Sequence, residues 1–126
     1  MSHWTNIKTQ IKDLTALAAA IAELGGTITR GQVERRGIVV EATINFPSCY
    51  PVYVSKQADG TYQLSGDSDI FRQRLPGGRV MGQNYAAIAQ LYAVHLATQQ
   101  ARRLGHNVAR VAGKNGAINL VLTGRM

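Results

Sequence analysis

The spacing of hydrophobic positions changes several times along the chain, and each change predicts a new element. Residues 5–11 alternate between one set containing threonine and isoleucine and a more polar set, which favours a strand. Ile7 and Ile11 also fit a helical period. However, Asp13 is a good N-cap for the amphipathic run that follows it, and Gly25 and Gly26 end that run. We therefore predict a strand at about 3–11 and a helix at about 13–24.

The middle of the chain has the clearest two-residue alternation. Apolar and polar residues alternate from Ile38 to Phe46, as expected for a strand with one buried face. Shorter strands are predicted around 52–54 and 62–64. The Asp59-Gly60 pair between them is a strong hairpin signal. A weaker strand is predicted at 27–33, so this region is expected to be antiparallel.

The second half begins with the longest irregular stretch, residues 65–82, and loops of that length are often functional. A helix is predicted from about 84 to 104, where apolar residues recur on one side until Gly105. Residues 108–112 and 117–123 are predicted to form a closing hairpin. We therefore predict an α+β fold, a two-layer sandwich of a mostly antiparallel sheet with two amphipathic helices on one face.

The length and apolar content of the chain limit the classes of protein to which it can belong. The 126 residues fit a single domain, taken as 1–126, and 45% of them are hydrophobic, enough for a continuous core. No apolar run approaches the roughly 20 residues that span a bilayer, and residues 1–15 do not resemble a signal peptide. Cys49 is the single cysteine, so no internal disulfide forms. A cytoplasmic protein without membrane contact is expected.

The charge adds information about partners. Lysine and arginine number 14 against 7 acidic residues, and arginine predominates, which suits bidentate contacts to phosphate or carboxylate. Nucleic acid, an acidic protein surface and a solvated face all fit this balance. Tyr53 and Tyr62, on neighbouring predicted strands, offer a stacking face for nucleic acid. The candidate binding residues are these two tyrosines and the basic groups Arg30, Arg35, Arg36, Arg72, Arg74, Arg79, Arg102 and Arg103.

The sequence contains few candidates for catalytic residues or metal ligands. The three histidines and Cys49 do not form the close sequence pairs that structural zinc sites use, so no metal or other cofactor is expected. Cys49 has no basic neighbour in sequence to activate it, and no phosphate-binding glycine motif is present. Asp67 and Asp69 lie two apart and are predicted to cap or turn a loop. No catalytic residue is assigned, which favours a non-enzymatic role.

Three blocks of the sequence together carry a resemblance to a known family: Met1 to Leu14, Leu91 to Gly105, and Asn115 to Leu122. They resemble a family of unknown function that includes a hypothetical protein of algal chloroplast genomes and cyanobacteria, an open reading frame of the ycf type. Its members usually have phenylalanine at the position of Trp4 and Asp-Gly at Asn115-Gly116. The resemblance implies association with ATPase modules of the AAA type. It also singles out His3, Tyr92 and His95 as a possible joint site, although a structural role for His95 is favoured.

These observations favour a non-enzymatic binding or assembly protein, an accessory or adaptor that self-associates or docks on a larger complex. One alternative is a basic nucleic-acid-binding module. A second is a viral structural protein, and a third is an enzyme centred on His95 and Tyr92.

Overall fold

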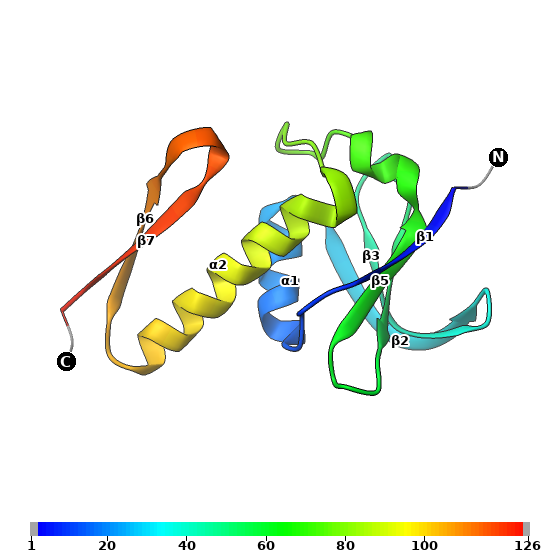
Figure 1. Cartoon of the computed structure of the whole chain (residues 1–126), viewed down its shortest axis with the longest axis horizontal. Helices are drawn as coiled ribbons and strands as arrows, with labels where there is room; N and C mark the ends of the chain where they lie inside the picture. Colours follow the sequence, from blue (N-terminus) through cyan, green and yellow to red (C-terminus); the bar gives the residue numbers. More distant parts are fainter. Residues whose placement is uncertain (1–2, 125–126) are drawn as a thin grey trace.

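The computed structural model describes residues 3–124. Five strands form one antiparallel sheet in the order β1-β5-β4-β3-β2, and two further strands form a separate hairpin. Helices α1 and α2 lie between the sheet and the hairpin (Figure 1). The elements are β1 (Trp4–Lys8), α1 (Leu14–Glu23), β2 (Thr27–Arg35), β3 (Ile38–Asn45), β4 (Val52–Lys56), β5 (Tyr62–Asp67), α2 (Ala86–Arg103), β6 (Asn107–Ala112) and β7 (Ile118–Thr123).

The predicted α+β class and antiparallel sheet are confirmed. The two-layer detail is not, because β6 and β7 pair only with each other in the described chain and lie across the helices from the sheet (Figure 1). Periodicity predicts that a strand exists and which of its faces is apolar. It does not predict which neighbouring strand completes the sheet.

Helix α1 begins where the sequence places its cap. The carboxylate of Asp13 accepts hydrogen bonds from the backbone N–H groups of Thr15 at 2.8 Å and Ala16 at 3.1 Å. A cap of this type stabilises a helix by about 1 kcal/mol. Behind it, Leu17 and Ile21 are fully buried against the sheet and α2. The helix then ends at the left-handed Gly25, as the sequence predicts.

The core lies between the inner face of the sheet and the two helices. Alternate residues of β3, β4 and β5 point into it, and Ile44, Val54 and Leu64 are at most 1% exposed. Burying side chains of this size contributes about 1.5–3 kcal/mol each. The alternation predicted from Ile38 to Phe46 is therefore the alternation between this core and the open face of the sheet.

Helix α2 begins two residues later than predicted because its first turn is interrupted. Asn84 and Tyr85 both have left-handed backbone angles, with φ of 55° and 59°. Such angles are uncommon in a bulky residue and cost on the order of 1–3 kcal/mol each unless packing enforces them. The Tyr85 ring is fully buried and meets Phe71 edge-on at 4.8 Å. This packing stabilises the left-handed backbone at the start of α2.

The stretch predicted to be irregular, 65–82, is more ordered than the sequence indicates. Strand β5 continues to Asp67, and a short 3-10 helix, η1 (Ser68–Arg72), follows it. The remaining loop folds back on itself, since the N–H groups of Leu75 and Met81 donate to the carbonyls of Arg79 and Gln73. Both donor residues are buried and anchor the loop to the core.

Candidate functional site

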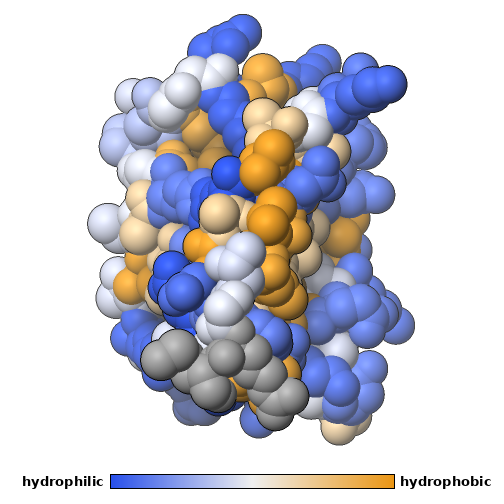
Figure 2. Space-filling view, turned by 90° about the vertical axis from the view of Figure 1, so that its left-hand side faces the viewer, coloured by the Kyte–Doolittle hydropathy of each residue, from blue (hydrophilic) through white to orange (hydrophobic). Residues whose placement is uncertain are grey.

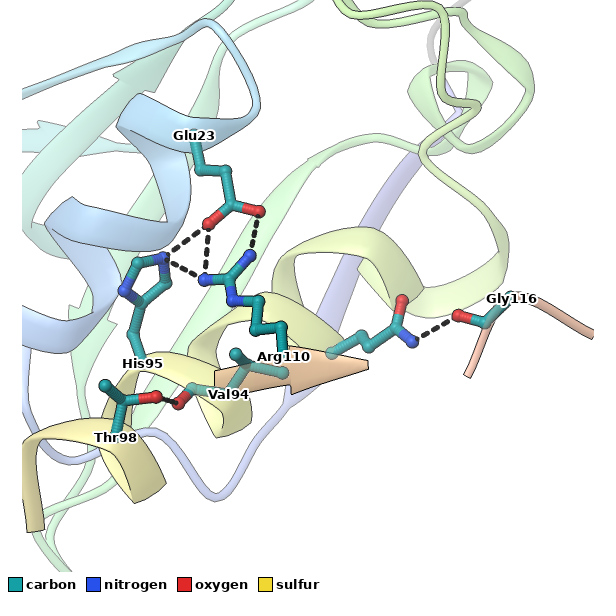
Figure 3. Close-up of polar contacts among 7 residues, drawn as sticks. Glu23, Val94, His95, Thr98, Arg110 and Gly116 are labelled. Carbon is teal, nitrogen blue, oxygen red and sulfur yellow. Dashed lines mark hydrogen bonds and ion pairs between the residues drawn. The ribbon is translucent and has the colours of Figure 1, made fainter. Parts of the chain in front are cut away.

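A three-residue ionic cluster joins the β6–β7 hairpin to both helices (Figure 3). Arg110 on β6 donates from Nη1 and Nη2 to the two carboxylate oxygens of Glu23, at 2.7 and 2.8 Å. His95 Nε2 on α2 lies 2.7 Å from Glu23 Oε1. We call these three side chains the clasp. Two-point arginine–carboxylate contacts of this kind fix orientation as well as distance, so the clasp sets how the hairpin lies on the helices.

The electrostatics of the clasp follow from its geometry. The hydrogen bond from Arg110 lowers the pKa of Glu23, with a smaller contribution from His95, against an opposing effect of burial. The same hydrogen bond raises the pKa of Arg110. Each side chain is between 22% and 39% exposed. Water therefore screens the attraction, and the clasp contributes on the order of 1 kcal/mol or less.

The hairpin has one covered and one uncovered face. Directly opposed residues of an antiparallel pair share a face. Arg110 pairs with Leu120, and Ala112 with Ile118, so these residues face the helices. Besides the clasp, a 2.8 Å hydrogen bond from the Gln90 side chain on α2 to the Gly116 carbonyl connects the hairpin to the helices.

The uncovered face of the hairpin carries exposed valines beside the polar Asn107, Asn119 and Thr123. Val111 and Val121 are 49% and 44% exposed there. At the base of the hairpin, Leu104 is also exposed, and so is Leu122, which pairs with Val108 and has the orientation of the other face. Figure 2, which views the molecule from this side, shows a hydrophobic stripe between polar margins. In addition, each strand has one edge without a partner strand in the described residues. We call these apolar residues and the two strand edges the hairpin surface.

The basic excess of the chain belongs to its second part. Residues 70–126 contain eight basic residues and no acidic one, which leaves six basic and seven acidic residues for 1–69. Arg102 and Arg103 are exposed at the end of α2, beside the base of the hairpin, and Lys114 is exposed at its tip. The hairpin surface is therefore apolar in its middle and cationic at both ends.

A second group of candidate residues lies on the open face of the five-stranded sheet. Trp4 stacks on Tyr53 with ring centroids 5.7 Å apart. The guanidinium of Arg36 lies 4.7 Å from the Trp4 ring centroid, and that of Arg35 lies 5.9 Å from the Tyr53 centroid. The predicted partnership of Tyr53 with Tyr62 is wrong, because Tyr62 is 8% exposed and belongs to the core. The strand periodicity places the two rings on opposite faces.

A third group surrounds the start of β1. His3 Nδ1 lies 3.4 Å from Asp69 Oδ2, and the side chains of His3, Asp67 and Asp69 can bring ligand atoms within 4.8 Å of one another. Arg72 Nη2 donates to Asp69 Oδ1 at 2.9 Å. Asp67 caps η1, as predicted, by accepting from the Asp69 N–H at 2.9 Å. An open cleft of about 590 Å³ lies beside this cluster.

The predicted arginines fall into separate groups rather than one. Arg35 and Arg36 lie over aromatic rings, and Arg72 joins the cluster around His3. Arg74 donates to the carbonyl of Gly78 in its own loop. The others are Arg30 on β2, Arg79 beside a cavity of about 170 Å³ that Glu23 also lines, and Arg102 and Arg103 at the end of α2.

The joint site suggested for His3, Tyr92 and His95 is not formed by the contacts of these side chains. His3 contacts Asp69, and His95 belongs to the clasp. The Tyr92 hydroxyl accepts hydrogen bonds from the backbone N–H groups of residues 12 and 13, which fixes the segment before α1. Tyr92 and His95 are one turn apart on α2 but have different partners.

Sequence reasoning missed two residues of the clasp. Glu23 lies 87 positions before Arg110, and neither residue belongs to a motif. In the sequence, Cys49 has no basic neighbour that would activate its thiol. The structure gives it intermediate burial, which raises the pKa of its thiol.

Comparisons of the chain with protein-family models, with curated proteins and with solved structures found no match. Between residues 3 and 124, no helix combines the length and apolar character needed to cross a membrane.

Proposed function

We propose that this chain is a non-enzymatic binding and assembly protein that docks an acidic protein segment on the hairpin surface. The observation that carries the proposal is a two-stranded sheet that exposes valines on its outer face and whose two edges have no partner strand within residues 3–124. Such edges are ready to pair with another chain, and natural proteins usually cover or charge them. Here the exposed Val111 and Val121 lie on the strands themselves.

The charge distribution supports an acidic partner. Extended segments that add a strand to a sheet gain affinity from backbone hydrogen bonds and specificity from alternate side chains. An approaching segment would meet Lys114 at one end of the hairpin and Arg102 and Arg103 at the other. A second copy of the chain would instead bring the same cations against one another, which is unfavourable.

The same role covers the accessory or adaptor function inferred from the sequence. An ATPase module of the AAA type, implied by the family resemblance, remains a prediction for the partner. A cytoplasmic location likewise remains a prediction. The hairpin surface supports a partner segment that is acidic at its ends and apolar in its middle.

The test is capture of proteins from native lysate after nuclease treatment, with three tagged chains compared side by side. The double substitution Val111→Ser and Val121→Ser should reduce capture of the bound protein at least about tenfold, as loss of apolar anchors at an interface centre does. Val39→Ser is the matched control, because Val39 is 54% exposed but belongs to β3 of the other sheet. Its capture should equal that of the unchanged chain.

Charge reversal completes the test. Arg102→Glu with Arg103→Glu should weaken the same capture, and added salt should reduce the difference between this variant and the unchanged chain. Equal capture by the Val111/Val121 variant and the unchanged chain would contradict the proposal. A doubled mass in size-exclusion chromatography without any partner would instead support self-association.

Nucleic-acid binding is a second candidate function, and the open face of the sheet favours it. Arg35 and Arg36 lie beside the stacked Trp4 and Tyr53, a combination found where single strands bind. A labelled single-stranded oligonucleotide should then bind with an affinity that falls steeply with salt, and Arg35→Ala with Arg36→Ala should weaken it. Affinity that does not change with salt would exclude this candidate.

A further inference from the structure

We infer that His3, Asp67 and Asp69 form a binding site for a divalent transition-metal ion of the Zn²⁺ type. The ligand atoms come from two segments that strand pairing brings together. Residue 4 of β1 pairs with Asp67 of β5, and the Ser68 N–H donates to the His3 carbonyl at 2.8 Å. The register of two strands that lie about 60 residues apart in sequence therefore places the imidazole beside both carboxylates.

The spacing of the three side chains suits one ion. Their ligand atoms lie within 4.8 Å of one another, and His3 Nδ1 is already 3.4 Å from Asp69 Oδ2. Zinc–nitrogen and zinc–oxygen bonds are about 2.0–2.2 Å long, so two ligands of one ion are at most about 4.4 Å apart. A small rotation of one exposed side chain is enough to close the remaining gap.

Each carboxylate is held at one oxygen and leaves the other available. Arg72 donates to Asp69 Oδ1, so Oδ2 is the oxygen nearer His3. Asp67 Oδ1 accepts from the Asp69 N–H. Metal sites commonly use outer partners of this kind to orient their ligands. The arrangement is therefore compatible with binding without breaking the hydrogen bond that caps η1.

The donor set determines the class of ion. One imidazole nitrogen with two carboxylates suits Zn²⁺ or Mn²⁺, whereas Mg²⁺ prefers oxygen ligands and keeps its water. Three protein ligands would leave at least one position of the ion for water or another ligand. The adjoining cleft of about 590 Å³, also lined by Gln83 and Asn84, provides the space for it.

The test is a Zn²⁺ titration of the full chain with any purification tag removed, followed by calorimetry and by fluorescence. Trp4 is the single tryptophan and lines the same cleft, so its emission reports binding at this place. We expect one Zn²⁺ per chain and much weaker binding of Mg²⁺. His3→Gln and, separately, Asp69→Asn should each weaken Zn²⁺ binding at least about tenfold.

His106→Gln is the matched control, because it removes a partly buried histidine from the turn before β6. It should bind Zn²⁺ as the unchanged chain does. The His3 side chain is 53% exposed, so its replacement leaves the core intact, and a thermal melt of each variant verifies this. No Zn²⁺ binding, or binding that His3→Gln leaves unchanged, would overturn the inference. Neither result would affect the proposal for the hairpin surface.

Discussion

The five-stranded sheet and the β6–β7 hairpin are both antiparallel, yet they differ in how their faces are covered. Both helices cover the inner face of the sheet, where Ile44, Val52 and Val54 are fully buried. On the inner face of the hairpin, Ile118 is only partly buried, and on the outer face the valines are exposed. The sheet is therefore stabilised by apolar burial, whereas the hairpin depends on the clasp and a few contacts with α2.

The difference shows that stability is distributed unevenly along the chain. Regions with few buried apolar contacts open with low free energy, while core strands open only on global unfolding. A weakly held element with an uncovered face is also suited to rearrangement when a partner binds. Truncation of the core and loss of the clasp test this contrast, and loss of two buried hydroxyl groups tests how polar groups are satisfied within the core. The expected effects decrease from the core truncation to the clasp.

The largest effect is expected from truncating the core. Ile44→Ala should lower the free energy of unfolding by about 2–5 kcal/mol, because it removes buried methyl groups and leaves a cavity. Leu122→Ala in the hairpin should change it by no more than about 0.5 kcal/mol, since Leu122 is 49% exposed. Urea denaturation followed by circular dichroism measures both values. Equal losses would show that the hairpin is part of the same cooperative core.

The two buried tyrosines of α2 and its first turn should respond in opposite directions to loss of their hydroxyl groups. Tyr92→Phe should lower the free energy of unfolding by about 1 kcal/mol or more, because two backbone N–H groups lose their acceptor. The buried Tyr85 hydroxyl has no hydrogen-bond partner in the described structure. Tyr85→Phe should therefore be neutral or stabilising by about 1 kcal/mol.

Thermal or urea unfolding of the two variants provides the measurement, and each serves as the control for the other. Burial, and to a lesser extent the charge of Asp67, raises the pKa of Tyr85, in agreement with an unfavourable site for a polar group. Destabilisation by Tyr85→Phe would show that its hydroxyl has a stabilising contact.

The smallest effect is expected from the clasp, and it should depend on pH. Arg110 holds the pKa of Glu23 below its ordinary value of 4.5. A carboxyl group with a lowered pKa stabilises the fold above its unfolded pKa, and this contribution is lost as pH falls through the folded pKa. Hydrogen exchange of the β6 and β7 amides should accordingly become faster relative to β3 as pH falls below about 4.5.

Glu23→Gln is the control for this measurement. It should accelerate exchange of the hairpin amides at neutral pH while changing global stability by about 1 kcal/mol or less. It should also remove the pH-dependent part of the difference between the hairpin and β3. Unchanged hairpin exchange in this variant would show that apolar contacts, rather than the clasp, hold β6 and β7.

The elements of the fold could be predicted from the sequence because they depend on local features. The Asp13 cap, the Gly25 helix end and the alternation from Ile38 to Phe46 all act over a few residues. The closing hairpin could be predicted, but its separation from the sheet could not, since its strands have the same alternation as strands of a larger sheet. Nor could the left-handed Tyr85, which tertiary packing enforces against its own preference.

The candidate sites were harder to predict than the fold because their residues are far apart in sequence. Glu23 and Arg110 meet only after both helices and the hairpin have packed. The proposed metal site forms only when β1 and β5 pair in register, because this pairing brings His3 close to Asp67 and Asp69. In the sequence, His3 is more than about 60 positions away from the two aspartates, and a pair of aspartates two positions apart fits a turn equally well.

The position of Arg110 late in the chain has a consequence for folding during synthesis. Chains leave the ribosome N-terminus first, at about 5–20 residues per second. All five strands of the sheet precede Ser68, and α2 is complete at Arg103. The core can therefore close while Glu23 still lacks its arginine partner, 87 residues downstream. The hairpin follows the strands and helices of the core in the chain, so the hairpin surface can form only after those elements have left the ribosome.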